Sequence, residues 1–149
     1  MSAFVTAGAG FLLAVLWFDL MFDVQVVGRG PGELPEAVLA SIAGYYARVT
    51  TAARPMNRLI AAVMLGTLAL IAVEIAEGAQ HGWAAWASLA LALAAITLAA
   101  IHTVPSAVRL GTRSDSSARQ GALARSICRD HLLCASAIAA LLALQLAFA

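Results

Sequence analysis

The chain has 149 residues, of which 62% are hydrophobic and only 11% are charged. A soluble domain is closer to half apolar and a quarter charged, so this composition excludes an ordinary soluble protein and indicates an integral membrane protein. The net charge of +1 says nothing about nucleic acid, but the sequence has no Lys-rich tract and no predicted helix with a basic stripe, so we expect no nucleic-acid partner. The length suits one domain of residues 1–149.

Four apolar segments are each long enough to cross a bilayer, which takes roughly 20 helical residues. We expect spans at about residues 3–27, 56–78, 83–104 and 124–147. This pattern predicts an all-α integral membrane four-helix bundle. The first ten residues contain no Lys or Arg, so we expect the first segment to be a permanent span and not a cleaved signal peptide.

The connections between the spans differ in character. Residues 28–55 open with a turn rich in glycine and proline, and residues 36–51 then carry apolar side chains at helical spacing. This spacing predicts an amphipathic helix between the first two spans. Residues 80–82 form a short connection, which predicts an antiparallel hairpin of spans two and three. Residues 105–123 are polar, and we expect a surface loop there.

All nine basic residues are arginines, and they flank the first and third connections. The two termini and residues 80–82 contain none. The positive-inside rule therefore predicts that the arginine-rich side faces the cytoplasm and that both termini lie outside. Trp83 and Trp86 would belong to the outer aromatic belt, and Tyr45 and Tyr46 to the inner one. We interpret the chain as a multi-pass protein of the bacterial inner (plasma) membrane.

The most informative residues are Asp19 and Asp23, which lie four residues apart on one face of the first span. An ionisable group within a bilayer costs roughly 3 kcal/mol or more, so such groups are rare and usually functional. The pair therefore predicts a polar site inside the bundle.

Other polar residues fall at the same depth. Counting along each span places four groups in the cytoplasmic leaflet, namely Asp19, Asp23, His102 and His131. Three residues at the start of the second span would form the remaining wall, namely Arg54, Asn57 and Arg58. We expect these seven residues to line one polar pocket.

The sequence leaves three interpretations of this pocket open. Carboxylates and imidazoles projecting into a bundle can bind a divalent transition metal such as Fe, Zn or Mn, and His102 and His131 could instead hold a haem. Alternatively, a metal-free pocket would pair the aspartates with arginines and use a histidine as a general base on a membrane-soluble substrate. In the third interpretation, aspartate–arginine pairs only hold the helices together.

A second polar group lies near the opposite face. Glu74, Glu77 and His81 share one side of the second span. Glu77 and His81 fall at the interface, where water solvates them, whereas Glu74 is about one turn deeper. Together with the inner cluster, Glu74 would allow a path for protons or ions across the bundle.

Two short stretches add a resemblance. His102-Thr103-Val104-Pro105 is followed by Arg129-Asp130-His131 at the start of the last span, and Tyr45-Tyr46-Ala47-Arg48 leads into Pro55-Met56. In this layout the chain resembles the small four-span membrane proteins related to anthrone oxygenases. The resemblance implies oxidation of an aromatic or lipid-like substrate, with His102 and His131 as candidate active-site residues.

We therefore expect a membrane-embedded oxidoreductase or oxygenase-like protein that acts on a hydrophobic small molecule at a cytoplasm-facing pocket. The two aspartates would bind metal or orient a base, and the two histidines would bind metal or move protons. Arg54, Asn57 and Arg58 would bind the substrate, with the arginines holding an anionic group. The alternatives are a non-enzymatic subunit of other membrane proteins and a small proton-coupled transporter. Besides lipid, a second copy of the chain is an expected partner, through alanine-rich helix faces.

Overall fold

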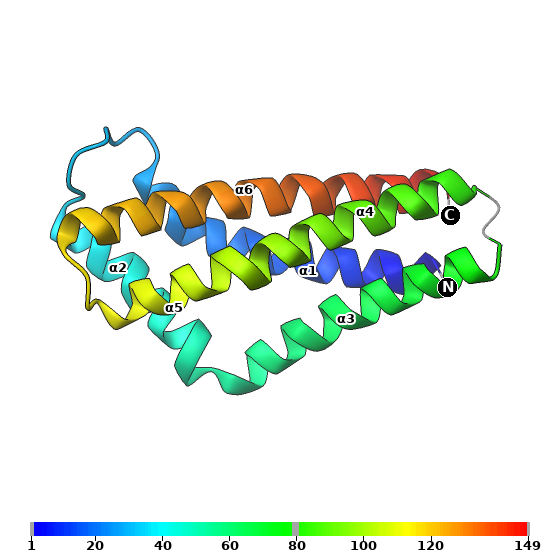
Figure 1. The fold of residues 1–149 in the computed structure, drawn as a ribbon, viewed down its shortest axis with the longest axis horizontal. Helices are drawn as coiled ribbons and strands as arrows, with labels where there is room; N and C mark the ends of the chain where they lie inside the picture. The colour runs from blue at the N-terminus through cyan, green and yellow to red at the C-terminus, as the bar shows by residue number, and fades with distance from the viewer. Residues whose placement is uncertain (1, 79–80, 149) are drawn as a thin grey trace.

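The computed structural model describes residues 2–78 and 81–148, which consist of helices joined by turns (Figure 1). The side chain of Arg54 also lies outside the described part. The α-helices are α1 (Ser2–Asp23), α2 (Glu36–Ala47), α3 (Arg54–Ala76), α4 (Gly82–Leu98), α5 (Val104–Thr112) and α6 (Ser117–Phe148). The predicted all-α fold is confirmed, and so is the helix between the first two spans.

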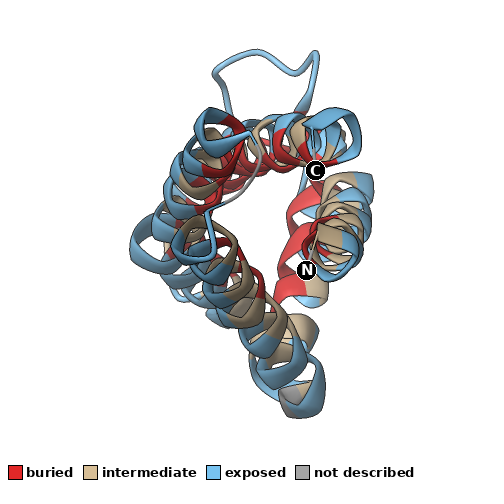
Figure 2. Cartoon of the chain, turned by 90° about the vertical axis from the view of Figure 1, so that its right-hand side faces the viewer, coloured by how far each residue is buried: buried red, intermediate tan, exposed pale blue. Residues whose placement is uncertain are grey.

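Helices α1, α3, α4 and α6 form a ring in that order, with α6 closing against α1 (Figure 2). Four segments are long and apolar enough to cross a membrane, namely Ser2–Val26, Pro55–Ala76, Gly82–Thr112 and Ser117–Phe148. Both termini lie at the end of the bundle where α3 meets α4, and α2 lies at the opposite end (Figure 1). The fold is that of a multi-pass helical membrane protein, and we refer to its two ends as the α2 end and the terminal end.

The prediction of a surface loop over residues 105–123 is wrong, because α5 and α6 occupy most of it and only residues 113–116 connect them. Pro105 lies in the first turn of α5, where its missing N–H costs little. The preceding residues, Ala99–Thr103, form a wider π-helical turn, which makes room for the proline ring. Helices α4 and α5 therefore continue as one rod. The segment is polar because α5 buries only one side, with Leu110 inside and Arg109 exposed.

Helix α2 packs on α5, α6 and the end of α1. Its buried side is apolar, with Leu39 and Ile42 almost completely removed from solvent. Gly111 of α5 lies against the α2 backbone, because a β-carbon at this position would come within 2.8 Å of the Ala47 nitrogen. This contact between backbones fixes how closely α2 covers the α2 end of the bundle.

The α1–α2 loop and the start of α2 are held by arginines from α6 and from the α5–α6 turn. The guanidinium of Arg125 donates hydrogen bonds to the carbonyl oxygens of Gly30 and Gly32, at 2.7 and 2.6 Å. Arg113 forms an ion pair with Glu36 at 2.8 Å. The α1–α2 loop is therefore tied to α6, and the α5–α6 turn is tied to the first residue of α2, both at the α2 end.

Helix α3 packs unevenly along its length. Its buried side chains, Thr67 and Ile71, lie in its second half, where Thr67 is so close to Gly8 of α1 that a β-carbon there would collide with its hydroxyl. In its first half α3 leans away from the other helices (Figure 1). The divergence creates the space in which the candidate site lies.

Candidate active site at the α2 end

A cavity of about 660 Å³ lies between α1, α3, the α4–α5 rod and α6, and α2 contributes to its wall. Most of its lining is apolar. The polar side chains that line it are Asp19, Tyr45, Tyr46, Thr50, Asn57, Thr103 and His131. They come from α1, from α2 and the turn after it, from α3, from the π-helical turn after α4 and from α6, so the site exists only once the bundle is assembled.

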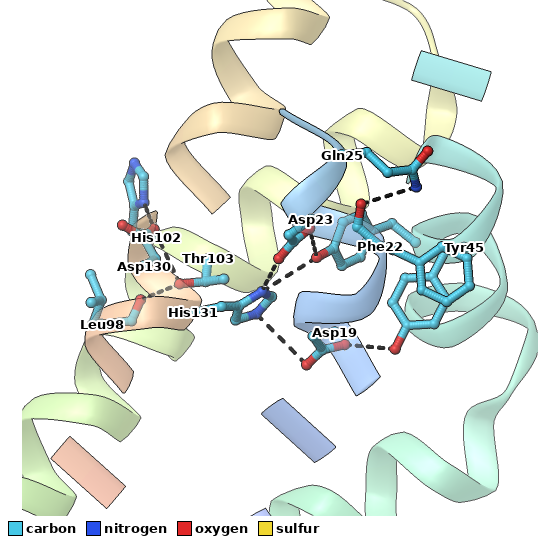
Figure 3. A network of polar contacts seen from close by, with 11 residues as sticks. Asp19, Phe22, Asp23, Gln25, Tyr45, Leu98, His102, Thr103, Asp130 and His131 are labelled. Atoms are coloured by element: carbon cyan, nitrogen blue, oxygen red, sulfur yellow. Dashed lines mark hydrogen bonds and ion pairs between the residues drawn. The ribbon is translucent and has the colours of Figure 1, made fainter. Parts of the chain in front are cut away.

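His131 and Asp23 form the centre of the site (Figure 3). His131 Nδ1 lies 2.6 Å from Asp23 Oδ2, and the hydroxyl of Tyr46 donates to Asp23 Oδ1 at 2.6 Å. Asp23 is fully buried and does not line the cavity, whereas His131 does. Because an ionised carboxylate only accepts hydrogen bonds, the proton of this pair belongs on Nδ1, which leaves Nε2 free to accept another proton.

Asp19 lies on the other side of the imidazole (Figure 3). Its Oδ1 accepts a hydrogen bond from the hydroxyl of Tyr45 at 2.7 Å, and its Oδ2 lies 3.8 Å from His131 Nε2. That separation is too long for a direct hydrogen bond. Tyr45 is held in place by stacking on Phe22, with ring centroids 4.1 Å apart. Asp19 Oδ2 and His131 Nε2 therefore both remain available to a molecule in the cavity.

The two tyrosines act as neutral donors. Burial, followed by the nearby negative charges of Asp19 and Asp23, raises the pKa of both the Tyr45 and Tyr46 hydroxyls far above the usual value. Each hydroxyl keeps its proton and donates it to one aspartate. The α2 helix thus supplies one hydrogen bond to each carboxylate.

A second histidine–aspartate pair lies on another side of α6 (Figure 3). His102 Nδ1 is 2.5 Å from Asp130 Oδ2, which also accepts a hydrogen bond from Thr103 at 3.2 Å. Asp130 is buried but His102 is exposed, and neither residue lines the cavity. The guanidinium of the exposed Arg129 lies 3.7 Å from Asp130 Oδ1.

The structure therefore divides the four residues that we predicted as one site. Asp19, Asp23 and His131 come together, and His102 pairs with Asp130 instead. In the described part of the chain, no group of three or more His, Cys, Asp or Glu side chains is arranged to hold a metal ion. A haem between the two histidines requires both to face one space, and only His131 lines the cavity.

The predicted fourth wall is only partly formed. Asn57 lines the cavity and donates to the Thr50 carbonyl at 2.8 Å. Arg58 is exposed and does not line it, and the Arg54 side chain lies outside the described residues. Among the described side chains, His131 is the ion-pair partner of both Asp19 and Asp23, and no arginine is.

The sequence analysis missed the role of three residues. We assigned Tyr45 and Tyr46 to an interfacial belt, yet their hydroxyls bind the two aspartates. Their position on the amphipathic α2 helix was the available signal. Asp130, next to His131, was not weighed as a partner of His102.

The polar residues near the terminal end lie apart from this site. One carboxylate oxygen of Glu74 is buried without a hydrogen-bond partner among the described residues. His81 Nδ1 lies 3.0 Å from the carbonyl oxygen of Phe148. On α3 the cavity extends only to Met64, which is about 15 Å along the helix from Glu74.

No protein-family model, curated protein or solved structure matches the chain.

Proposed function

We propose that the protein is a membrane-embedded enzyme of the oxidoreductase or oxygenase type, which acts on a hydrophobic small molecule with His131 as the proton acceptor. The observation that carries this proposal is the position of Asp23, which is fully buried behind His131 and binds its Nδ1. A histidine oriented by a carboxylate, with its other nitrogen free beside a cavity, has the arrangement of a general base.

The chemistry would begin with a proton moving from the substrate to His131 Nε2. The imidazolium that forms would be stabilised by Asp23 at 2.6 Å and Asp19 at 3.8 Å. The apolar lining keeps water away from the reacting groups, so the fixed charges of Asp19 and Asp23 act on them with little screening. The substrate anion formed in this step would pair with the imidazolium, which offsets the charge of Asp19. It would then form a carbon–oxygen bond to dioxygen from the surroundings, and the resulting peroxide would take the proton back from His131 to leave as a hydroperoxide, in keeping with the resemblance to anthrone oxygenases.

The same proposal places the site near the cytoplasm of a bacterial cell. The arginines of the chain lie in the α1–α2 loop, at the junction of α2 and α3, and around the α5–α6 turn, and both the loop and the α5–α6 turn are at the α2 end (Figure 1). The positive-inside rule supports an inner-membrane protein with its α2 end in the cytoplasm and both termini outside. Accessibility of single cysteines introduced at Ser116 and His81 to a membrane-impermeant thiol reagent tests this orientation.

The enzyme hypothesis is tested by comparing lipid-soluble compounds extracted from cells that express the wild type, His131→Gln or His102→Gln. Both variants remove an imidazole that is bound to an aspartate, but only His131 lines the cavity. We expect at least one compound to change with the wild type and with His102→Gln, and to stay at its background level with His131→Gln.

Membrane yield and helical content must be equal among the three proteins for the comparison to hold. Identical extracts from folded wild type and folded His131→Gln would contradict the enzyme and favour a non-enzymatic subunit.

A further inference from the structure

The polarity of the cavity changes along the bundle axis. On α1 its lining runs from Asp19 to Phe11, a rise of about 12 Å along the helix. Beyond the polar groups at the α2 end, the deeper lining is apolar, with Phe11, Val15, Met64 and Ile138. A molecule that matches this pattern has one polar head and an apolar body, with the head at the α2 end.

The hydroxyl donors of the lining are already in use. Tyr45 and Tyr46 donate to Asp19 and Asp23, Thr50 donates to the Tyr46 carbonyl at 2.6 Å, and Thr103 donates to Asp130. The Asn57 amide also donates within the protein, to the Thr50 carbonyl. The polar end of the cavity therefore offers a ligand few donors.

The hydrogen-bond acceptors of the lining, in contrast to its donors, are not in use. Asp19 Oδ2 and His131 Nε2 are 3.8 Å apart and face the cavity without a direct hydrogen bond between them. No arginine is among the described lining residues. An anionic head group would therefore meet the Asp19 carboxylate, and juxtaposed like charges are strongly unfavourable.

The cavity also reaches the lateral surface of the bundle. Phe18, Met56 and Val104 line it and are at the same time exposed, on α1, α3 and α5. All three lie in segments that are apolar enough to cross a membrane. A ligand could therefore enter sideways from the bilayer, beside the diverging half of α3.

We infer that the cavity binds a membrane-resident amphiphile whose head donates hydrogen bonds and carries no negative charge, such as a hydroxyl-bearing lipid or ring compound. The inference rests on the site of the proposed function and names its class of substrate. It replaces our expectation that Arg54 and Arg58 hold an anionic group.

The test uses two probes that differ only in the head, 1-pyrenebutanol and 1-pyrenebutyrate, with the full chain in lipid nanodiscs. Energy transfer from tryptophan to pyrene reports binding, and the saturable part above that of empty nanodiscs is compared. We expect the alcohol to bind at least about tenfold more tightly than the carboxylate. Asp19→Asn should bring the two affinities to within about threefold of each other, because it removes the charge that repels the carboxylate.

A matched pair of variants locates the binding site. Ala61 and its neighbour Ala62 are both exposed, but only Ala61 lines the cavity. We expect Ala61→Phe to abolish saturable binding of the alcohol and Ala62→Phe to preserve it. Equal or tighter binding of the carboxylate by the wild type, no saturable binding of the alcohol, or retention of binding in Ala61→Phe would each overturn the inference.

The two proposals can fail separately. Selective binding of the alcohol, together with extracts that do not depend on His131, would leave the ligand class standing and remove the enzyme. Turnover that depends on His131, together with tighter binding of the carboxylate than of the alcohol, would leave the enzyme standing and remove the ligand class.

Discussion

The two histidine–aspartate pairs contain the same groups at almost the same distance but lie in different surroundings. His131 is 2.6 Å from Asp23 and His102 is 2.5 Å from Asp130. Both aspartates are buried, yet the side chain of His131 is 10% exposed beside a cavity, whereas that of His102 is 46% exposed outside it. Only the first pair has an enclosed space in which a substrate could meet it.

The difference arises from one step along α6. Asp130 and His131 are consecutive, and consecutive residues of an α-helix point about 100° apart. His131 therefore meets Asp23 of α1, while Asp130 meets His102 in the π-helical turn after α4. Adjacent residues thus serve two separate pairs, and geometry rather than residue type separates the candidate site from the outer pair.

The largest effect is expected on turnover, once the metabolite comparison has identified a reaction. Asp23→Asn keeps the size of the side chain but removes the charge that orients and stabilises His131, so the rate should fall about 100-fold or more. Asp130→Asn should leave the rate within about twofold, because Asp130 does not line the cavity. Steady-state kinetics of the two purified variants measures both, and equal losses would mean that the outer pair also takes part.

Stability should separate the pairs next. Asp23→Ala leaves His131 and Tyr46 buried without their acceptor, which should cost about 3 kcal/mol of unfolding free energy. Asp130→Ala should cost about 1 kcal/mol, because the exposed His102 can bind water. Denaturant unfolding in mild detergent, followed by circular dichroism, gives both values. A larger loss of unfolding free energy for Asp130→Ala than for Asp23→Ala would show that the exposure of the histidine does not determine how much each aspartate stabilises the fold.

Alkaline titration of the tyrosine hydroxyls reports on the His131–Asp23 pair alone, because neither tyrosine contacts the His102–Asp130 pair. Tyr45 and Tyr46 are the only tyrosines of the chain, and both serve the inner aspartates. Their folded pKa values lie above the unfolded value of about 10. The stability that this shift provides is complete below pH about 10 and is lost as the pH rises further.

Tyrosinate absorbance should therefore appear only together with the loss of helical circular dichroism. His102→Gln should not alter that behaviour, since neither tyrosine contacts His102. Tyrosinate that forms at pH about 10 in a fully helical protein would contradict the structure of the inner pair.

The smallest effect concerns the outer pair alone. Arg129 lies 3.7 Å from Asp130 and its side chain is 71% exposed. Arg129→Ala should change the unfolding free energy by no more than about 0.5 kcal/mol, because exposed ion pairs are weak. The same denaturant experiment measures it, and a loss above 2 kcal/mol would show that the outer pair is shielded from water.

Hydropathy was sufficient to predict the fold, because four long apolar runs have few structural solutions in lipid. The place of Asp19 and Asp23 in a polar site was also predictable, because charged residues are rare in an apolar helix. The partners of His102 and His131 were not. Counting residues gives depth along a helix, but α6 is rich in Ala and Leu on all sides, so its sequence does not indicate which side faces the cavity. Depth alone placed both histidines in one site.

The missed helix α5 has a related cause. Pro105 and the polar residues after it are typical of a loop, yet a proline fits the first turn of a helix and one polar side fits an exposed helix. Tyr45 and Tyr46 were misassigned because an interfacial tyrosine and a buried donor have the same spacing. Tertiary contacts decide between the two, since both hydroxyls bind aspartates of α1 and Tyr46 is buried.

The hydrogen bonds from Arg125 to the α1–α2 loop have a consequence for which loop residues can vary in sequence. Its guanidinium binds the carbonyl oxygens of Gly30 and Gly32, which every amino acid possesses. A β-carbon at either glycine meets open space. Random mutagenesis of the loop should therefore recover many side chains at positions 30 and 32, while position 125 remains arginine, so that one residue preserves the course of a loop whose own sequence is free to vary.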